Sequence, residues 1–483
     1  MTEKSGAQIG KKAFLQSLGI LFGLMIFAGL LTRWLPAGSY DRIQENGREL
    51  IVADSFHYIE KPVYPVWRWF TAPLEVLGSE HGLSVIVIIL FILIVGGSFA
   101  VLDHSGILKS SLSGIVRRFG NRKYILLLVV SFFFMALGAF FGIFEEIVPL
   151  VPLMLGLSYF LGWDTLVGLG MSVLATNIGF SAAMTNPFTI GVAQQIAGLP
   201  LFSGLWFRIP IFLAFYLIFA FFLLRYAQRV ERDPESSLVF AEDRNEHRKY
   251  DLASLQSQSK MNRQHRRAVG WFGACAGLIL LVLMAGPFVP GLSDYALPVV
   301  ALLFLIGGIG AGLLAGESGQ QVFKALGQGI GGIAPGIILI LMAVSVNFIV
   351  VRGGVMDTIL HAASGMFAGA SPYSAAFLMF FLALGVEIFI SSGSAKAFLL
   401  MPILLPLADL VGVTRQVTVT AYCFGDGFSN LAYPTNPVLL IVLGLTVVSY
   451  PKWIRWTLKL WFWVLLVSLA FLALGVLIGY GPF

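Results

Sequence analysis

The chain has 483 residues, of which 58% are hydrophobic and only 12% are charged, and its net charge is +6. A soluble protein normally has about twice that charged fraction, so an ordinary soluble globular protein is excluded. Nucleic acid is not expected as a partner, because basic loops on the cytoplasmic side of a membrane explain the positive charge better. Cys275 and Cys423 both lie in apolar stretches and are predicted to be small core residues, since two cysteines make no disulfide framework or metal set.

Six apolar stretches are long enough, at roughly 18 to 25 residues, to cross a hydrocarbon core about 30 Å thick. They are Phe14–Thr32, Leu83–Leu102, Leu205–Leu224, Trp271–Pro290, Ala296–Ala315 and Leu458–Tyr480. We therefore expect an all-α, multi-pass protein of the bacterial cytoplasmic membrane, with the lipid bilayer as its surroundings. The first stretch is too long for a cleaved signal peptide and is predicted to be a retained span.

The distribution of basic residues predicts which connections face the cytoplasm. Lysines precede the first span, so the N-terminus is predicted to be cytoplasmic. The segment 37–81 has four basic and seven acidic residues and is predicted to lie outside. The connections Asp103–Lys123 and Arg225–Arg267 are rich in Lys and Arg and are predicted to lie inside. Lys452, Arg455 and Lys459 predict a further cytoplasmic turn.

The chain between Lys123 and Arg225 must then cross the membrane an even number of times, yet three apolar stretches lie there. The number of crossings is even if the first stretch, about 124–160, is a re-entrant hairpin that enters and leaves on the same side. Glu145 and Glu146 would lie at its tip. The next stretch, about 163–198, is predicted to be an interrupted span that contains Thr185-Asn186-Pro187.

The second half of the chain repeats this order of features about 250 positions later. Thr435-Asn436-Pro437 corresponds to the first Thr-Asn-Pro, and Gly354–Phe367 corresponds to the amphipathic stretch Ser105–Phe119. We predict a first repeat at 1–226, a basic cytoplasmic linker at 227–268, a connecting span at 269–290 and a second repeat at 291–483. The second repeat has a hairpin at about 373–411 and an interrupted span at about 413–446. The odd number of intervening crossings predicts that it is inverted, an arrangement typical of transporters.

Breaks in membrane helices indicate a polar site, because unpaired backbone survives only beside protein or a water-filled cavity. Asn oxygens and carbonyls freed by proline suit a cation, and the N-terminus of a half-helix suits a carboxylate. The predicted solute-binding residues are Glu145, Glu146, Asn177, Thr185, Asn186, Ser391, Ser392, Gly393, Ser394, Lys396, Asp426, Asn430, Thr435 and Asn436. The ion-coupling candidates are Glu146, Glu387, Asn186 and Asn436.

Several residues have simpler interpretations. Glu387 and Lys396 also fit a structural pair that neutralises its own charge, and Asp164 and Asp409 fit ordinary interface positions. The cluster Tyr64–Phe70 fits an anchor at the outer interface. The glycine pattern at 327–332 matches a dinucleotide-binding motif but has no βαβ context, and Ser392 to Lys396 lacks the spacing of a Ser/Lys hydrolase. An enzyme is therefore not expected, and no cofactor is predicted.

The two hairpin tips, Phe144–Pro152 and Ser391–Pro406, together with the two Thr-Asn-Pro breaks, resemble the YfcC family. This family is related to anaerobic C4-dicarboxylate carriers of the DcuC type, within the ion transporter superfamily. The resemblance covers essentially the whole chain and implies a homodimer in which a transport domain moves like an elevator against a scaffold. In the superfamily, Ser-Asn-Thr tips form solute and sodium sites, whereas Glu145-Glu146 stands at the first tip here. YfcC-like proteins are commonly assigned to basic amino acid exchange.

The charges at the breaks favour one substrate class. Four acids, Glu145, Glu146, Glu387 and Asp426, accompany one base, Lys396, so a dicarboxylate would be repelled unless most acids were protonated or paired. We therefore predict transport of a small charged organic solute, an amino acid and in particular a basic one, with a dicarboxylate as the alternative. Proton coupling, sodium coupling and pure exchange all stay open, and a channel is the other non-enzymatic possibility.

Overall fold

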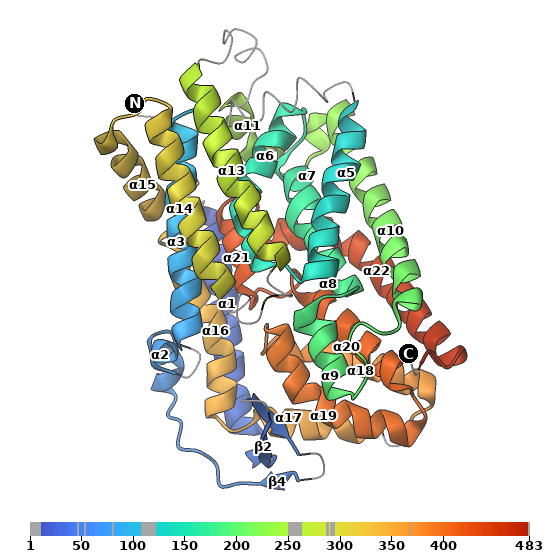
Figure 1. Ribbon diagram of the computed structural model, residues 1–483. Coiled ribbons are helices and arrows are strands. Elements are labelled where there is room, and N and C mark those ends of the chain that lie inside the picture. Colours follow the sequence, from blue (N-terminus) through green and yellow to red (C-terminus); the bar gives the residue numbers. More distant parts are fainter. Residues whose placement is uncertain are drawn as a thin grey trace.

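The computed structural model describes residues 11–45, 48–52, 55–79, 82–107, 122–249, 263–285, 289, 295–367 and 369–481. Helices make up most of this part of the chain (Figure 1). Nine helical stretches within it are long and apolar enough to cross a membrane, which supports the prediction of a multi-pass protein. They are Phe14–Trp34, Val85–His104, Lys123–Phe141, Thr165–Ile196, Leu205–Arg232, Leu297–Leu314, Gly319–Arg352, Gly393–Val411 and Tyr450–Leu477.

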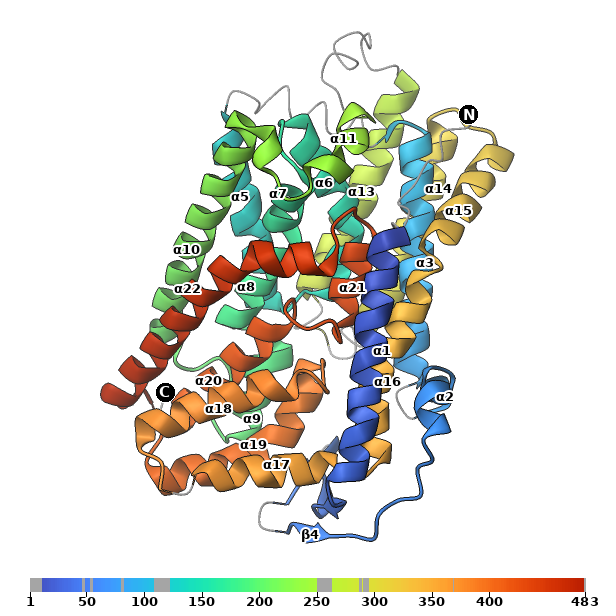
Figure 2. The same ribbon diagram turned by 180° about the vertical axis from the view of Figure 1, so that it is seen from behind.

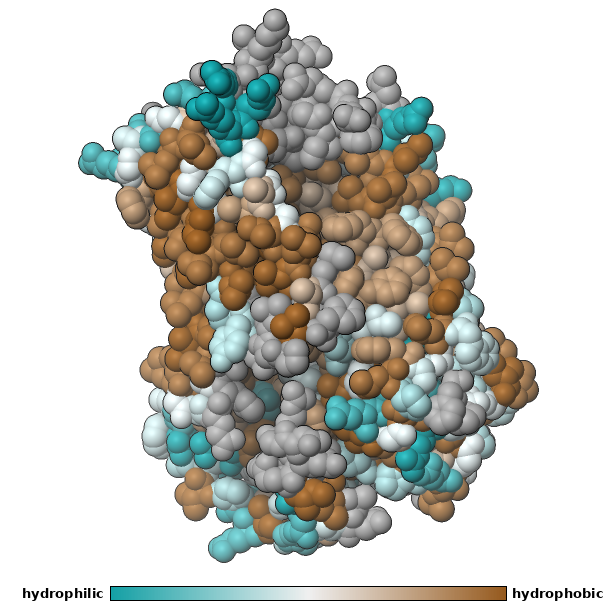
Figure 3. Space-filling model, in the orientation of Figure 1, coloured by the Kyte–Doolittle hydropathy of each residue, from teal (hydrophilic) through white to brown (hydrophobic). Residues whose placement is uncertain are grey.

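The molecular surface is divided as a membrane protein requires. Figure 3 shows apolar side chains over the middle of one face and hydrophilic side chains toward both ends. Helix α11 (Phe240–Lys249) lies at one end of the molecule, and the strands near residues 38–58, at which helix α1 (Lys11–Trp34) ends, lie at the other (Figures 1 and 2). The segment 37–81 and the start of the linker therefore lie at opposite ends, as the charge pattern predicts, and which end is cytoplasmic stays a prediction.

The prediction of an all-α fold is wrong for the segment between α1 and helix α2 (Trp67–Glu75). Four short strands form two antiparallel two-stranded sheets there: β1 (Gly38–Ser39) pairs with β4 (His57–Tyr58), and β2 (Arg42–Glu45) pairs with β3 (Arg48–Ile51). Strands this short have almost no periodic signal in the sequence. The segment is tied to the rest of the molecule because Arg42 forms an ion pair with Asp357, 2.9 Å away.

The helices form two groups that lie side by side in Figure 1. In the first group, α1 packs against α16, and α3, α13, α14 and α15 pack against one another. Its elements are α1, α2, η1 (Val76–Gly78), α3 (Gly82–His104), α13 (Arg263–Ala285), α14 (Ala296–Leu314), α15 (Gly319–Ile333) and α16 (Gly336–Arg352). The glycine pattern at 327–332 lies inside helix α15, not in a loop after a strand.

The second group contains both predicted hairpins and both predicted interrupted spans. Its first-repeat elements are α5 (Lys123–Ala136), η3 (Leu137–Phe141), η4 (Glu145–Leu150), α6 (Val151–Phe160), α7 (Thr165–Leu169), η5 (Gly170–Leu174), α8 (Ala175–Ala182), η6 (Pro187–Gly191), α9 (Val192–Ile196) and α10 (Leu205–Arg232). Its second-repeat elements are α18 (Pro372–Val386), α19 (Gly393–Val411), α20 (Arg415–Ser429), α21 (Pro437–Gly444) and α22 (Tyr450–Leu477). Helix α17 (Met356–Ser364) and η10 (Gly365–Phe367) join the two groups; the corresponding stretch Ser105–Phe119 lies largely outside the described residues.

The first hairpin returns to the end where it begins. The ring of Tyr124 at the start of α5 lies 6.0 Å from the ring of Trp163, which follows α6. In the second hairpin, α18 packs against α19. Figure 1 shows the first hairpin in the upper half of the molecule and the second in the lower half. This placement is the one that an inverted repeat requires, and the inversion itself stays a prediction.

The crossing helices α8 and α20 pack closely against each other, and α8 also packs against the first hairpin. A Cβ atom added at Gly427 would lie only 2.4 Å from the Cα atom of Ser181. A Cβ atom at Gly179 would lie 1.9 Å from the backbone oxygen of Met135 in α5. Glycine at these two positions therefore allows the backbones to approach more closely than any side chain would permit.

Asp164 is not an ordinary interface residue, because it is 2% exposed and fixes the linker to the helices. Its carboxylate accepts hydrogen bonds from the backbone N–H of Val167, at 2.9 Å, and from the hydroxyls of Tyr226 and Ser237. Asp243 of α11 accepts from the Tyr159 hydroxyl at 3.0 Å and from the backbone N–H of Thr165 at 2.7 Å. Burial, with a smaller contribution from the Asp164 carboxylate, raises the pKa of Asp243 to about 7, although the hydrogen bonds from Thr165 and Tyr159 lower it.

The linker is thus ordered at its start. After α10 ends at Arg232, η7 (Pro234–Ser236) and α11 follow, and residues 250–262 lie outside the described part. The predicted turn at Lys452–Lys459 is also wrong, because these residues lie in the first turns of α22. Pro451 suits the first turn of a helix, and the apolar periodicity continues through the basic positions.

Candidate functional site

The first hairpin tip is formed where α5 stops. Helix α5 continues into the π-helical turn η3 and ends at Gly142, whose φ is 69°. Glycine adopts this left-handed conformation at low cost and so terminates the helix. A Cβ atom here would lie 2.3 Å from Oδ1 of Asn186, so the tip lies directly against the first break.

The two carboxyl groups of this tip begin the returning helix. Glu145 is exposed and Glu146 is half-buried at the start of η4. Oε2 of Glu146 accepts a hydrogen bond from the backbone N–H of Phe144 at 3.2 Å. Negative charge is favourable at the N-terminus of a helix, which explains why two acids are tolerated here at depth in an apolar protein.

The second tip presents hydroxyls and backbone instead of charge. Helix α18 ends at Val386, and α19 begins at Gly393 after an N-cap at Ser392. The Ser392 hydroxyl accepts from the backbone N–H of Ala395 at 3.4 Å. The residues 391–394 are all at least partly exposed, so the N-terminal end of α19 is accessible.

A cavity of about 430 Å³ brings the two tips together. Its polar lining comes from both tips and from Asn430 of the second break. Aromatic walls come from Phe144, Phe180 and Phe188, and the start of α3 with residues 295–298 closes the remaining side. Such a size suits a small organic molecule. The sequence predictions at Glu145, Glu146, Ser391, Ser392, Gly393, Ser394 and Asn430 therefore share one cavity.

Lys396 does not line this cavity, since it is fully buried behind the second tip. Its ammonium group contacts Glu387 and lies 2.8 Å from Oδ1 of Asp426. All three side chains are 0% exposed. The structural-pair interpretation of Glu387 and Lys396 is therefore supported and extended to a triad that includes Asp426. Buried charges require such pairing, because an isolated ion would carry a large desolvation cost.

The two breaks begin new half-helices in the same way. Oδ1 of Asn186 accepts from the backbone N–H of Phe188 at 2.9 Å, and Oδ1 of Asn436 accepts from that of Val438 at 3.0 Å. Each Asn is thus an N-cap followed by proline at the first helical position. Before the first break, Ala183 has a left-handed backbone with φ 43°. The Asn oxygens proposed for cation binding already accept hydrogen bonds from these half-helices.

The remaining predicted residues lie around the breaks. The Thr185 hydroxyl donates to the backbone oxygen of Phe140 at 2.8 Å, which ties the first break to the first hairpin. Asn436 donates through Nδ2 to Oδ1 of Asn430 at 3.0 Å. Asn177 in α8 is fully buried, and its side-chain atoms have no hydrogen-bond partner among the described residues. The hydroxyl of Thr435 also lacks one in that part of the chain.

Two residues near the second tip were not predicted. The hydroxyl of Tyr422 in α20 donates to the backbone oxygen of Gly393. The methyl group of Thr189 would lie 3.0 Å from a Cβ atom at Gly393. Both residues limit where this tip can lie. Both residues lie within the predicted interrupted spans but outside the Thr-Asn-Pro breaks themselves, so neither was selected as a site residue.

An apolar helical protein with two hairpin tips and two interrupted helices around one polar cavity defines a multi-pass membrane transporter. The comparison with protein families identifies the transporter family. Residues 14–477 match DcuC, described as the C4-dicarboxylate anaerobic carrier, and the chain belongs to this family.

Individual relatives agree with this family. The chain is 29% identical over 481 residues to a protein of Escherichia coli K12 named "Putative basic amino acid antiporter YfcC", with 91% of this chain and 92% of that one covered. It is 24% identical over 506 residues to a Haemophilus influenzae protein named "Uncharacterized protein", with 96% and 97% covered. The predicted relation to YfcC and DcuC is therefore confirmed.

Two solved transporter structures are also similar. The YdaH transporter of Alcanivorax borkumensis has 18% identity and a TM-score of 0.41, with 97% of this chain and 100% of that chain covered. MtrF of Neisseria gonorrhoeae, from a class of antimetabolite efflux pumps, has 16% identity and a TM-score of 0.42, with 95% and 94% covered.

Proposed function

We propose that this protein is a secondary active transporter that exchanges basic amino acids across the bacterial cytoplasmic membrane, with a cytoplasmic N-terminus. The observation that carries this proposal is the charge that faces the cavity. Among the described lining residues, Glu145 and Glu146 are the charged ones. The lysine that a dicarboxylate would need is buried in an ion triad.

A basic amino acid has a complementary charge distribution. Its cationic side chain would lie near Glu145 and Glu146, where charge-assisted hydrogen bonds are available. Its carboxylate would lie near Ser391–Ser394, at the N-terminal end of α19, where backbone N–H groups and the helix dipole favour an anion. The aromatic walls at Phe144 and Phe188 would contact the aliphatic part of the solute.

The two groups of helices support an elevator mechanism. We assign the group with both hairpins and both broken helices as the moving part and the group of α1, α3 and α13–α16 as the scaffold. The repeats at 1–226 and 291–483 are assigned as inverted copies, and a homodimer is proposed to hold the scaffold still. The cavity lies where residues of α3 and α14 face the hairpin tips, as transport between the two groups requires.

Exchange without an ion is the coupling mode that we propose first. Proton coupling through Glu146 is the next possibility, since this half-buried carboxyl is accessible from the cavity. Sodium coupling at Asn186 and Asn436 would have to use the second lone pair of each Oδ1 atom or other nearby oxygens, because one lone pair already caps a half-helix. A dependence of counterflow on a sodium or proton gradient would distinguish the three modes.

A C4-dicarboxylate is the second candidate substrate, favoured by the description of the family. Its binding would require Glu145 and Glu146 to be protonated or paired, because two carboxylates repel another dianion. Its carboxylates would then contact the hydroxyls and backbone N–H groups of the second tip.

Counterflow in proteoliposomes tests the proposal. Vesicles are preloaded separately with arginine, ornithine, neutral amino acids, succinate or fumarate, and uptake of each labelled compound is followed. We expect saturable counterflow of arginine and ornithine, reduced at least about tenfold in Glu146→Gln because a charge-assisted contact is lost. Glu235→Gln, at an exposed linker position, is the matched control and should transport normally. Counterflow of dicarboxylates alone would overturn the proposal in favour of the second candidate.

A further inference from the structure

A large groove lies on the outside of the helix bundle, away from the cavity between the hairpin tips. It has a volume of about 840 Å³ and runs between helices α10 and α22. Aromatic contacts form its floor: the ring of Trp456 lies 5.2 Å from that of Phe222 and 5.3 Å from that of Tyr226. Since the floor is built from packed rings, of which those of Trp456 and Tyr226 are buried, the groove belongs to the α10–α22 contact.

Four basic side chains face this groove, two from each helix. Arg225 and Arg229 are one helical turn apart on α10, and Arg455 and Lys459 are one turn apart on α22. Residues four positions apart lie on the same helix face, so both pairs point into the space between the helices. All four side chains are exposed. The groove therefore concentrates four positive charges along its two sides.

No carboxylate among the described residues forms an ion pair with any of these four side chains. Two acids on the adjoining helices are engaged elsewhere: Glu231 accepts from Lys123 at 2.6 Å, and Glu242 pairs with Lys452 at 2.6 Å. Lys452 provides an internal comparison, because it lies on α22 only three residues before Arg455. The basic residue of α22 outside the groove lining has a protein carboxylate, whereas the two that line the groove have none.

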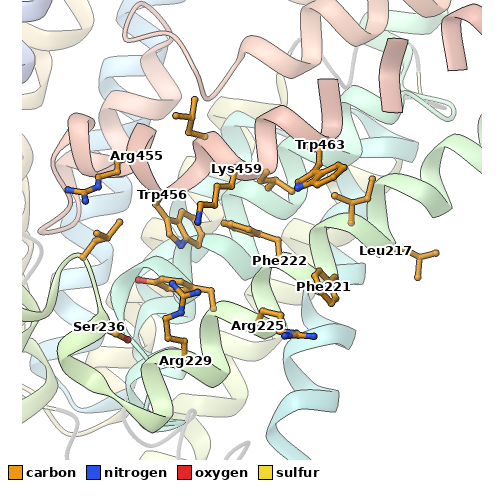
Figure 4. Close-up of a pocket in the computed structure, with 15 residues that line it drawn as sticks. Leu217, Phe221, Phe222, Arg225, Arg229, Ser236, Arg455, Trp456, Lys459 and Trp463 are labelled. Carbon is orange, nitrogen blue, oxygen red and sulfur yellow. The ribbon is translucent and has the colours of Figure 1, made fainter. Parts of the chain in front are cut away.

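The groove changes from basic to apolar along its length, with Arg225 and Lys459 between its two ends. Figure 4 shows Arg229, Arg455 and Ser236 toward one end and Leu217 and Trp463 toward the other. The apolar end continues along the outward faces of α10 and α22, where Leu217 is 66% exposed and Trp463 is 56% exposed. A ligand that fills the groove must therefore have an anionic head and long apolar chains.

We propose that the groove between α10 and α22 binds an anionic glycerophospholipid. Its phosphate contacts the four cations, and its acyl chains lie on the apolar end, which faces the hydrocarbon region of the bilayer. Basic pockets between membrane helices bind anionic lipid headgroups in this way. Positive charge at helix ends also orients membrane proteins, but orientation alone does not require two pairs from different helices to converge on one groove.

The position of the groove would allow the bound lipid to bridge two helices. Helix α10 follows the first interrupted helix, and α22 follows the second, so the lipid would bridge the two repeats on their outer side. It would supply the anionic partner that the protein itself does not provide. Anionic lipid is therefore expected to stabilise the packing of α10 on α22.

Thermal unfolding of the purified, delipidated full chain tests this assignment. We expect phosphatidylglycerol or cardiolipin in detergent micelles to raise Tm and phosphatidylcholine to leave it unchanged. Native mass spectrometry should show retained anionic lipid. The groove variant removes all four charges, and the control variant removes four exposed basic residues elsewhere. The groove variant is R225Q/R229Q/R455Q/K459Q, and the control is R244Q/R263Q/R266Q/K324Q.

The expected result is that the groove variant loses at least about tenfold in apparent affinity for phosphatidylglycerol, because each basic residue near an anionic headgroup contributes appreciably. The control should keep wild-type affinity. If the groove variant does not fold, the charge-preserving R225K/R229K/R455K variant should retain the lipid-induced shift, and R225Q/R229Q should weaken it.

Three outcomes would overturn the proposal. Equal shifts with phosphatidylcholine would indicate a non-selective apolar surface. An equal shift with inorganic phosphate alone would indicate a simple anion site. A change of oligomeric state in the groove variant, with no change in lipid binding, would make the groove an interface between copies of the chain.

Discussion

The two hairpin tips have similar positions in the fold, but the first exposes its charged side chains to the cavity and the second buries its charged side chain. The first tip directs Glu145 and Glu146 into the cavity, where they are at least partly exposed. The second tip directs Ser391–Ser394 into the cavity and keeps Lys396 fully buried behind them, between Glu387 and Asp426.

This difference shows that the charges of a site cannot be counted from sequence alone. Four acids and one base lie near the breaks, but two of the acids are buried together with the base and do not face the cavity. The pair that remains accessible gives the cavity its negative character. The comparison therefore separates residues that contact a solute from residues that hold a tip in place, and mutations can test the separation.

Removing the lysine is expected to have the largest effect on folding. In Lys396→Met, Glu387 and Asp426 lose their buried counter-ion, which costs about 3–5 kcal/mol. We expect a marked drop in Tm, measured by differential scanning fluorimetry. The triple variant E387Q/K396M/D426N, which leaves no charge behind, should recover most of it. A Lys396→Met protein with normal Tm but no transport would instead place the lysine in solute binding.

A glycine pair tests whether the geometry of the first tip matters beyond its charge. Gly142 and Gly162 both have left-handed backbones, with φ of 69° and 85°. Alanine costs about 1–2 kcal/mol at either position. At Gly162 the added Cβ meets nothing within 4 Å, whereas at Gly142 it meets Asn186 at 2.3 Å.

We therefore expect Gly142→Ala to reduce counterflow at least about tenfold, because the tip and the break are displaced together. Gly162→Ala is expected to lose a similar amount of intrinsic backbone stability but to keep its transport rate. The measurement is initial counterflow rate per folded protein. Equal rates in the two variants would show that the position of the tip is not critical.

The outer ends of the hairpins differ as well, and this difference predicts a small pH effect. The first hairpin is held by buried Asp243, and the second ends near the exposed Asp409–Arg415 pair. Because the pKa of Asp243 is raised to about 7 when α11 is docked, the docked form binds the proton more tightly than the undocked form. Docking therefore weakens as the pH rises from about 4 to about 7, and it changes little above 7 because both forms are then deprotonated.

Hydrogen exchange of residues 240–249, corrected for the intrinsic pH dependence, measures this docking. Protection is expected to fall as the pH rises from about 4 to about 7 in the wild type and to level off above about 7. Asp243→Asn cannot titrate and should show a flat profile. An identical slope in both proteins would assign the effect to another group.

The sequence predicted the positions of the breaks and hairpin tips because each has a chemical marker. Asn-Pro ends one half-helix and begins another, and acids or serines in an apolar run indicate a tip. The chemical roles of the same residues were harder to predict from the sequence. Asn186 and Asn436 were expected to offer oxygens to a cation, but a local N-cap uses those oxygens, and sequence cannot distinguish the two uses.

Features that depend on distant partners were missed. Asp164 and Asp243 are 79 positions apart and meet only because α11 folds back onto the start of α7. The strands β1–β4 are too short for a periodic signal, and the basic residues of α22 were interpreted as a turn because charge was taken to end a span. In each case tertiary contacts, not local pattern, determine the structure.

Ala183, just before the first break, has a backbone strain that a single substitution would relieve. Its left-handed backbone is strained for any residue with a Cβ atom and relaxed for glycine. Alanine and glycine codons differ by a single base, so relief of this strain is one mutational step away. Laboratory evolution for thermal tolerance would reach that step early. The protein with Ala183 is therefore less stable at the first break than a protein with glycine at this position would be.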